Sequence, residues 1–194
     1  MRLKVLFVLA VGLVTLGCTK EDPAVPDSNH LIIRGEVPSR DSDIIMNRET
    51  NRRAVEEFSF VGWTDGCYNL RYGDIKTRKS LPGNIPFGGE KSIEHLWELE
   101  WFSSLEVIQD YEFYRCSGLR VVVLPPSVRS IGRQAFGGCY ALDSLYVRGR
   151  IAPAIAEDAF DIRIPVIVVP QGTKEAYDKA DGWLAFRDYI IERR

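Results

Sequence analysis

Histidine and cysteine are too scarce in this chain to build a familiar metal site. The 194 residues include two histidines, His30 and His95, far apart in sequence, and four cysteines without a Cys-x-x-Cys spacing. Zinc sites take three or four such ligands, usually in close pairs. The sequence also lacks a nucleophile elbow, a histidine-based triad and the Gly-Lys-Ser/Thr ending of a phosphate loop. We therefore expect no catalytic residue, no metal ion and no cofactor, and we predict that the protein is not an enzyme.

The chain also lacks an excess of positive charge and has few long hydrophobic runs. The formal net charge is −2 at pH 7, which gives no reason to expect nucleic acid as a partner. One long apolar run, Val5 to Val14, follows Arg2 and Lys4. It is shorter than the roughly 20 apolar residues that a membrane span requires, and its layout is typical of a secretory signal peptide. We assign residues 1–17 to this signal.

The signal ends in Leu16-Gly17-Cys18, which resembles the lipobox of bacterial lipoproteins. The resemblance implies that Cys18 becomes the first mature residue and carries lipid; a plain signal peptide with a chance cysteine is the alternative. Residues 18–30 are polar and contain proline, which favours a flexible tether. Lys20-Glu21-Asp22 resembles the signal that sends some lipoproteins to the outer face of the outer membrane. We expect a lipid-anchored, surface-exposed outer-membrane protein, with a periplasmic location as the alternative.

A repeat occupies the second half of the chain. The stretch "IGRQAFGGCYAL" (residues 131–142) has a degraded copy, "IQDYEFYRCSGL", at residues 108–119. The pattern extends upstream, where residues 96–108 align with 119–131, and downstream from Ile155, giving three to four units. The four apolar pairs that keep one constant offset are Ile108/Ile131, Phe113/Phe136, Cys116/Cys139 and Leu119/Leu142. A period in the range of roughly 20–29 residues indicates a leucine-rich-repeat solenoid with a parallel sheet, which we predict over residues 93–170.

One segment of the repeat, "LRVVVL" (residues 119–124), alternates like a half-buried strand. Val122 and Leu124 should point into the solenoid, and Val121 and Val123 should point outward. The outward column is more apolar than a solvated strand face, so we expect something to cover it. The cover is either another part of this chain or a partner protein with Tyr146 as anchor. The candidate partner-binding face comprises Val121, Val123, Ser144, Tyr146 and Val168.

Three cysteines remain after Cys18, an odd number for an oxidising compartment: Cys67, Cys116 and Cys139. At least one thiol therefore stays free or pairs between chains. Cys116 and Cys139 share a position in neighbouring units, so we expect their α-carbons about 5 Å apart, within reach of a disulfide. Parallel side chains instead favour two buried thiols, which is the interpretation that we prefer.

The segments "IGRQAFGGCYALDSLYV" and "LRVVVLPPSVRSIG" resemble the BspA-type leucine-rich repeat. The resemblance covers residues 93–194 and implies a bacterial surface protein that binds host or partner proteins, in several members as an adhesin. It indicates the fold strongly and the ligand hardly at all. Glu112 departs from the pattern, because the following units have alanine at its position, as Ala135 and Ala159. Such departures suit an edge unit.

Both ends of the solenoid need a cap. Residues 171–194 predict a helical C-terminal cap: Thr173 begins a helix, Gly182 ends it, and Trp183 and Phe186 fold back. Residues 31–92 carry no period, but "HLIIRGEV" and "FSFVGW" resemble strands and "LPGNIPFGG" a loop. We predict a β-rich N-terminal cap packed on the first unit, with a small separate domain as the alternative.

We predict a binding protein that uses the outward face of its solenoid to engage a partner protein. The alternatives are a structural subunit of an outer-membrane assembly and a glycan-binding surface lipoprotein. The candidate aromatic residues for sugar stacking are Trp97, Trp101, Tyr111, Tyr114 and Tyr140, although packing explains such residues more often. Glu98 and Glu100 share a predicted outward strand face, where paired carboxylates would be required for glycoside hydrolysis. We interpret them as a solvated face.

Overall fold

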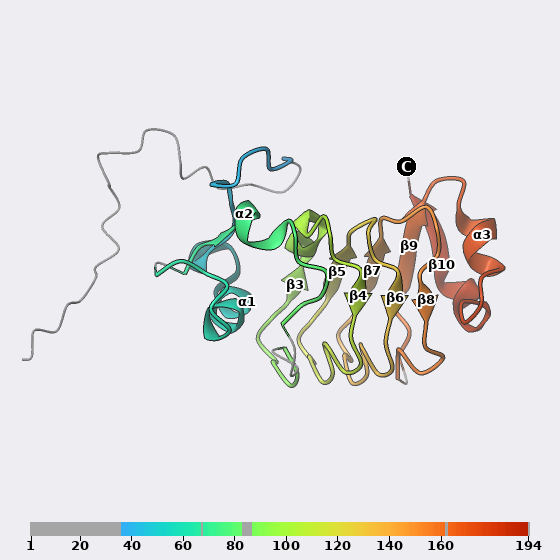
Figure 1. The fold of residues 1–194 in the computed structure, drawn as a ribbon. Helices are drawn as coiled ribbons and strands as arrows, with labels where there is room; N and C mark the ends of the chain where they lie inside the picture. The colour runs from blue at the N-terminus through green and yellow to red at the C-terminus, as the bar shows by residue number, and fades with distance from the viewer. Residues whose placement is uncertain (1–35, 67, 83–86, 162, 194) are drawn as a thin grey trace, which may run out of the picture.

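A computed structural model describes residues 36–66, 68–82, 87–161 and 163–193. The predicted signal peptide, Cys18 and the tether lie outside these residues, and so does Cys67. Figure 1 shows a row of stacked coils, with the helix α1 (Arg48–Phe60) at the N-terminal end and α3 (Lys174–Asp178) at the other. In the part of the chain that the structure describes, no helix has the length and hydropathy needed to cross a membrane.

Two parallel sheets run along the stack and fit a repeat solenoid. The larger has the order β10-β9-β7-β5-β3 and the smaller β4-β6-β8. Their strands are β3 (His95–Leu96), β4 (Val107–Ile108), β5 (Val121–Leu124), β6 (Ser130–Ile131), β7 (Ser144–Val147), β8 (Ala154–Ile155), β9 (Val166–Pro170) and β10 (Ile190–Arg193). Ser80 also forms a parallel bridge with Val107. The stack therefore begins before residue 93, where the first repeat was predicted to start.

The number of residues that separates paired positions in the sequence, here called the offset, varies along the larger sheet. Val121 pairs with Ser144, which is the offset that also separates Cys116 from Cys139. The offset from His95 to its partner Val121 is longer, and the offset from Ser144 to Val166 is slightly shorter. The first coil is longer because it contains a 3₁₀ helix, η1 (Trp97–Trp101). The predicted alignment of residues 96–108 with 119–131 is therefore wrong at its start.

This insertion changes the positions of three predicted residues. Leu96, aligned with Leu119 in sequence, pairs with Val122 instead. Glu98 and Glu100 belong to η1 and not to a strand. Glu98 is fully buried, so the predicted solvated pair of glutamates does not exist.

Apolar side chains fill the interior of the solenoid. Val122 and Leu124 are fully buried, as predicted. A column of stacked phenylalanine rings runs through the coils, with neighbouring centroids 5.2 to 5.5 Å apart. Its members are Phe87, Phe113, Phe136 and Phe160, and Phe58 and Phe186 extend it at the two ends. Because each aromatic pair contributes about 0.5–1.5 kcal/mol beyond its buried area, this phenylalanine column ties adjacent coils together.

The two cysteines of the repeat are buried free thiols. The Cys116 thiol donates to the Phe87 carbonyl at 2.7 Å, and the Cys139 thiol donates to the Phe113 carbonyl at 2.9 Å. The hydrogen bond with Cys139 and burial raise the pKa of the Cys116 thiol. The preferred prediction of two buried thiols is confirmed, and each thiol joins its coil to the preceding one.

The N-terminal segment is not β-rich, contrary to the prediction. It contains β1 (Ile44–Met46), α1, β2 (Leu70–Arg71) and α2 (Tyr72–Ile75), with β1 and β2 antiparallel. The stretch "FSFVGW" does not form a strand, because its first residues end α1. Ala54, Val55 and Phe58 face the core at helical spacing, whereas Phe60 is 88% exposed. Burial of this helical stripe overrides the strand preference of the alternating phenylalanines.

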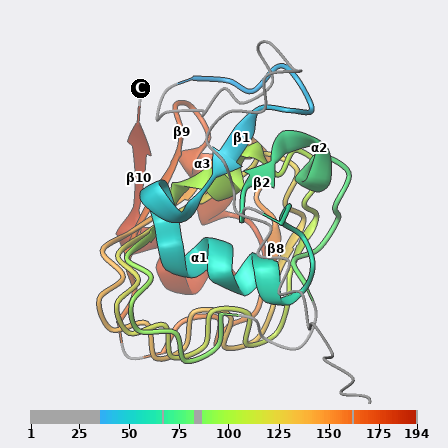
Figure 2. The same ribbon diagram turned by 90° about the vertical axis from the view of Figure 1, so that its left-hand side faces the viewer.

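The helix α1 nevertheless covers the open end of the stack, and Figure 2 shows it lying across the coils. Phe58 contacts Phe102 of the first coil with ring centroids 5.7 Å apart. Asn51 Nδ2 donates to the His95 carbonyl at 2.8 Å. This segment packs on the first coil, and its side chains belong to the same hydrophobic core as the repeats.

The C-terminal segment is helical in part. It comprises α3, a 3₁₀ helix η2 (Leu184–Tyr189) and the strand β10, which extends the larger sheet. Thr173 lies at the start of α3 as predicted, but its hydroxyl donates to the Pro170 carbonyl and does not cap the helix. Trp183 and Phe186 are buried. The end of the solenoid is therefore closed by a strand in addition to helices.

Candidate binding site on the outward sheet face

One outward column crosses four strands of the larger sheet. Val123, Tyr146, Val168 and Ile191 lie side by side in register. Val123 and Val168 are only 3% and 7% exposed, whereas Tyr146 is half-buried and Ile191 is 49% exposed. For Val123 and Val168 the chain itself supplies the cover that was expected over this column, which is the first of the two alternatives given above. The sequence did not indicate Ile191 as a member of this column, because β10 was expected to be part of a helical cap.

Part of the cover over this column comes from the chain itself. The 3₁₀ helix η1 packs against β5, and Glu100 in η1 accepts a hydrogen bond from Arg148 at 3.2 Å. The extra residues of the first coil thus pack beside β5, the strand that carries the buried Val123. Val121 and Ser144, at the other end of these strands, stay half-buried.

Two arginines flank the ring of Tyr146. Arg193 Nη1 donates to the Tyr146 hydroxyl at 3.1 Å. The guanidinium carbons of Arg148 and Arg193 lie 5.8 and 5.7 Å from the ring centroid, a distance at which cations are attracted to aromatic faces. The arginines come from distant positions in the chain and meet because β10 joins the sheet beside β9.

A depression of about 550 Å³ adjoins the Tyr146 ring. Its walls combine apolar and cationic side chains, and none of the described residues that line it carries a carboxylate. The members that matter chemically are Tyr146, Arg148, Arg150, Val168, Pro170 and Arg193. We call this set the Tyr146 site. Of these residues, the sequence indicated Tyr146 and Val168 and missed the arginines and Pro170; the Arg-Gly-Arg spacing at 148–150 was the available signal.

Comparison with known families now classifies the repeats. A family model described as the BspA type leucine rich repeat region matches residues 90–180 in six copies. Over these residues the chain is similar to BspA-type leucine-rich repeats. The match includes more copies than the three to four units expected from the sequence, and it begins a little earlier than residue 93. A search of curated proteins found no match.

The repeats do not gather the aromatic side chains considered for sugar stacking into one flat surface. Trp97 and Trp101 lie in η1. Tyr111 and Tyr114 meet edge to face, with ring centroids 5.5 Å apart, an arrangement that offers no flat platform. Tyr140 is 56% exposed in a turn. The structure therefore adds no support to the glycan alternative.

The two glutamates considered for glycoside hydrolysis, Glu98 and Glu100, have different partners. Glu98 is buried near His95, with Oε2 3.5 Å from Nδ1, and Glu100 is paired with Arg148. Among the described residues there is no group of three histidine, cysteine, aspartate or glutamate side chains able to hold a metal ion.

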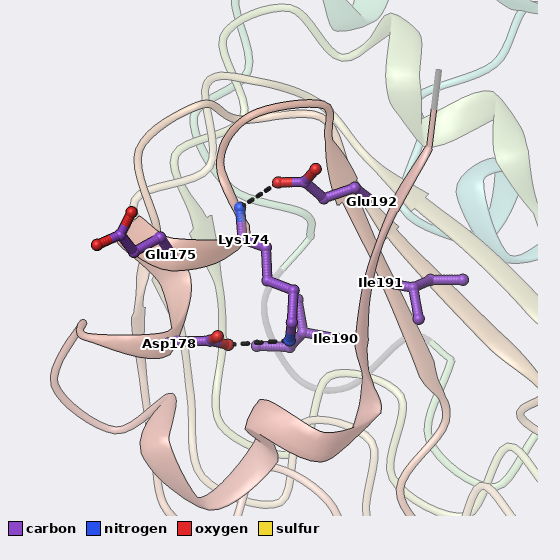
Figure 3. A pocket seen from close by; sticks show the side chains of 6 residues that line it. All are labelled: Lys174, Glu175, Asp178, Ile190, Ile191 and Glu192. Atoms are coloured by element: carbon purple, nitrogen blue, oxygen red, sulfur yellow. Dashed lines mark hydrogen bonds and ion pairs between the residues drawn. The ribbon is translucent and has the colours of Figure 1, made fainter.

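A second depression, of about 600 Å³, lies between α3 and β10. Figure 3 shows that its charged groups are largely engaged with one another. Lys174 Nζ donates to Asp178 at 3.2 Å, and the Lys174 backbone N–H donates to Glu192 at 2.8 Å. Hydrogen bonds from backbone N–H groups, with that of Lys174 the strongest, lower the pKa of the Glu192 carboxyl. These contacts hold α3 against β10, so we interpret this depression as part of the cap.

Proposed function

We propose that this protein is a lipid-anchored, non-enzymatic binding protein of the bacterial cell surface that engages a partner protein through the Tyr146 site. The observation that carries the proposal is the half-buried Tyr146 ring, flanked by two arginines beside an open depression. Leucine-rich repeats of this class suggest a role in protein interaction, and solenoids present extended surfaces suited to it.

The chemistry of Tyr146 supports a role in recognition. Its ring supplies apolar contact area while its hydroxyl forms hydrogen bonds, and tyrosine and arginine are enriched among the residues that dominate binding energy. The Arg193 hydrogen bond and the sheet register hold the ring in place before a partner arrives. A preorganised anchor loses less entropy on binding.

The location and the anchor are further parts of the proposal. Cys18, at the end of an apolar run, carries lipid, and the short charged stretch after it directs the protein to the outer face of the outer membrane. At that location the solenoid faces either host molecules, as in adhesion, or other proteins of the same surface. The second situation is that of an accessory subunit in an outer-membrane assembly.

The test is capture of defined partners by the immobilised full chain. Extracellular-matrix proteins and membrane extracts of the producing cell serve as separate inputs, with Tyr146→Asp as the test variant. Tyr140→Asp is the matched control, because Tyr140 is an exposed tyrosine outside the Tyr146 site. We expect Tyr146→Asp to lose the captured protein and Tyr140→Asp to retain it.

The two inputs separate the two versions of this function. Enrichment from matrix proteins supports adhesion, and enrichment from the cell's own membranes supports an assembly role. If the wild-type chain enriches nothing from either input, or if Tyr146→Asp folds and still captures the same protein, the proposed function is wrong.

A further inference from the structure

We propose that the Tyr146 site binds the carboxylate side chains of an acidic peptide segment in the partner protein. This inference rests on the proposed function and specifies the chemical character of the segment that the partner presents. Three arginines, Arg148, Arg150 and Arg193, converge on one depression whose described lining has no carboxylate. The chain as a whole has a formal net charge of −2, so this cationic site differs in sign from the rest of the molecule.

Two of the arginines are already held in place. Arg148 is paired with Glu100 at 3.2 Å and is still 50% exposed, which leaves much of its guanidinium accessible. Arg193 donates one Nη1 hydrogen bond to the Tyr146 hydroxyl. These bonds hold both guanidinium groups near the Tyr146 ring. Because a guanidinium carries five N–H donors, both side chains still have donors available for a ligand.

The third arginine is the most available. Arg150 is exposed, and it forms no ion pair with any residue that the structure describes. The loop that carries it is tethered, because the buried Tyr177 hydroxyl donates to the carbonyl of the adjacent Gly149 at 2.7 Å. Arg150 therefore sits on an anchored backbone at the edge of the depression.

The lining matches a carboxylate on a short side chain. Arginine forks pair with carboxylates through two parallel N–H···O bonds, and such charge-assisted bonds are about twice as strong as neutral ones. Val168, Pro170 and the Tyr146 ring supply an apolar wall against which the methylene groups of glutamate can pack. A volume of about 550 Å³ lies within the range of roughly 300–1,000 Å³ for ligand pockets, enough for one or two such side chains.

Acidic sugars also present carboxylates, but the structure favours a peptide. The site has an apolar wall and a half-buried tyrosine edge, whereas the aromatic residues suited to sugar stacking do not come together. An extended acidic peptide offers methylene groups and carboxylates in alternation, which fits a surface of mixed apolar and cationic character.

The experiment measures binding of a fluorescent octaglutamate peptide to the full chain by anisotropy, at low and at physiological salt. Octaglutamine of the same length is the neutral probe, and oligogalacturonate is the sugar-acid probe. The test variant is Arg150→Gln/Arg193→Gln. Its matched control, Arg129→Gln/Arg187→Gln, removes two exposed arginines outside the Tyr146 site and changes the net charge equally. Thermal melts confirm that each variant folds.

We expect octaglutamate to bind at least about tenfold more tightly than octaglutamine, and the test variant to lose about tenfold, as expected for removal of charge-assisted hydrogen bonds. The control variant keeps wild-type affinity. Equal losses in both double variants, equal binding of octaglutamine, or tighter binding of oligogalacturonate each overturn the acidic-peptide proposal.

The two proposals fail in different ways. If a partner captured by the wild-type chain depends on Tyr146 but is retained by Arg150→Gln/Arg193→Gln, the acidic-peptide inference is wrong and the proposed binding function stands. If no partner is captured at all, the proposed function fails, and the octaglutamate measurement still decides whether the site recognises acidic peptides.

Discussion

Glu112 occupies a position that alanine holds in the next two coils. Ala135 and Ala159 are fully buried, and Glu112 is only 2% exposed. Its Oε1 atom has no hydrogen-bond partner among the residues that the structure describes. Burial raises the pKa of the Glu112 carboxyl to about 7, because the charged form loses hydration without a compensating cation.

Replacing this carboxylate should stabilise the protein above neutral pH. The pKa of Glu112 is raised in the fold, so its contribution to stability is fully present below the unfolded pKa of 4.5 and is lost as the pH rises through about 7. We expect Glu112→Ala to raise the free energy of unfolding at pH 8 by about 2–3 kcal/mol. Urea denaturation at pH 5 and pH 8 measures the difference.

Glu112→Gln is the control for this prediction. It removes the titration but keeps an amide in the same buried place, so it should flatten the pH dependence with a smaller stabilisation than Glu112→Ala. If both variants keep the pH dependence of the wild-type chain, another group is responsible for it.

At the scale of elements, α1 begins at a well-formed cap. Asn47 Oδ1 accepts hydrogen bonds from the backbone N–H groups of Glu49 at 2.9 Å and Thr50 at 3.1 Å. The Thr50 hydroxyl accepts from the Asn47 backbone N–H at 3.0 Å. These bonds satisfy donors that the first turn of a helix leaves without partners. They stabilise the first turn of α1, which precedes a kink in the helix at Asn51.

We expect Asn47→Ala to lower the free energy of unfolding by about 1 kcal/mol, because alanine cannot accept these bonds. Asn47→Asp keeps an acceptor at the same position and should stay close to the wild-type value. Chemical denaturation followed by circular dichroism measures both. If Asn47→Ala unfolds at the wild-type denaturant concentration, the cap does not stabilise the fold.

The elements also show where sequence reasoning succeeded and where it failed. The strands of the repeat were predictable because Val122 and Leu124 follow the period of a strand in a motif that recurs. The 3₁₀ helix η1 was not predictable, because an insertion in a repeat has no copy to align with. The prediction of a strand at "FSFVGW" failed for a different reason. Its first residues belong to a helix that buries Phe58 against Phe102.

At the scale of the whole molecule, the column of phenylalanine rings connects one end to the other. It begins at Phe58 in the N-terminal segment, passes through the coils and ends at Phe186 in the C-terminal cap. The buried indole N–H of Trp183 in the C-terminal cap also has a partner, because it donates to the Pro153 carbonyl at 2.6 Å. The N-terminal segment and the C-terminal cap therefore share one hydrophobic core with the coils between them.

The proposed lipid anchor at Cys18 is tested at the scale of the whole cell. We expect Cys18→Ser to abolish lipidation and to move the protein from the membrane fraction to the soluble fraction after cell lysis, because a lipid chain supplies the membrane affinity that a cleaved signal no longer provides. Fractionation followed by immunoblotting measures the change, with Cys139→Ser as a control for the loss of a thiol elsewhere. Unchanged fractionation of Cys18→Ser would show that the lipid anchor is absent.

The sequence alone determined the repeat class, the inward positions of its strands and the burial of Cys116 and Cys139. Equivalent positions in successive repeats have equivalent surroundings, so a recurring apolar position indicates a buried one. Only the tertiary structure brought together the residues of the candidate Tyr146 site. Val123 is buried in the fold, and Arg193 reaches Tyr146 because β10 joins the sheet. The physical reason is that periodicity encodes contacts between equivalent positions, whereas the Tyr146 site joins positions that no repeat relates.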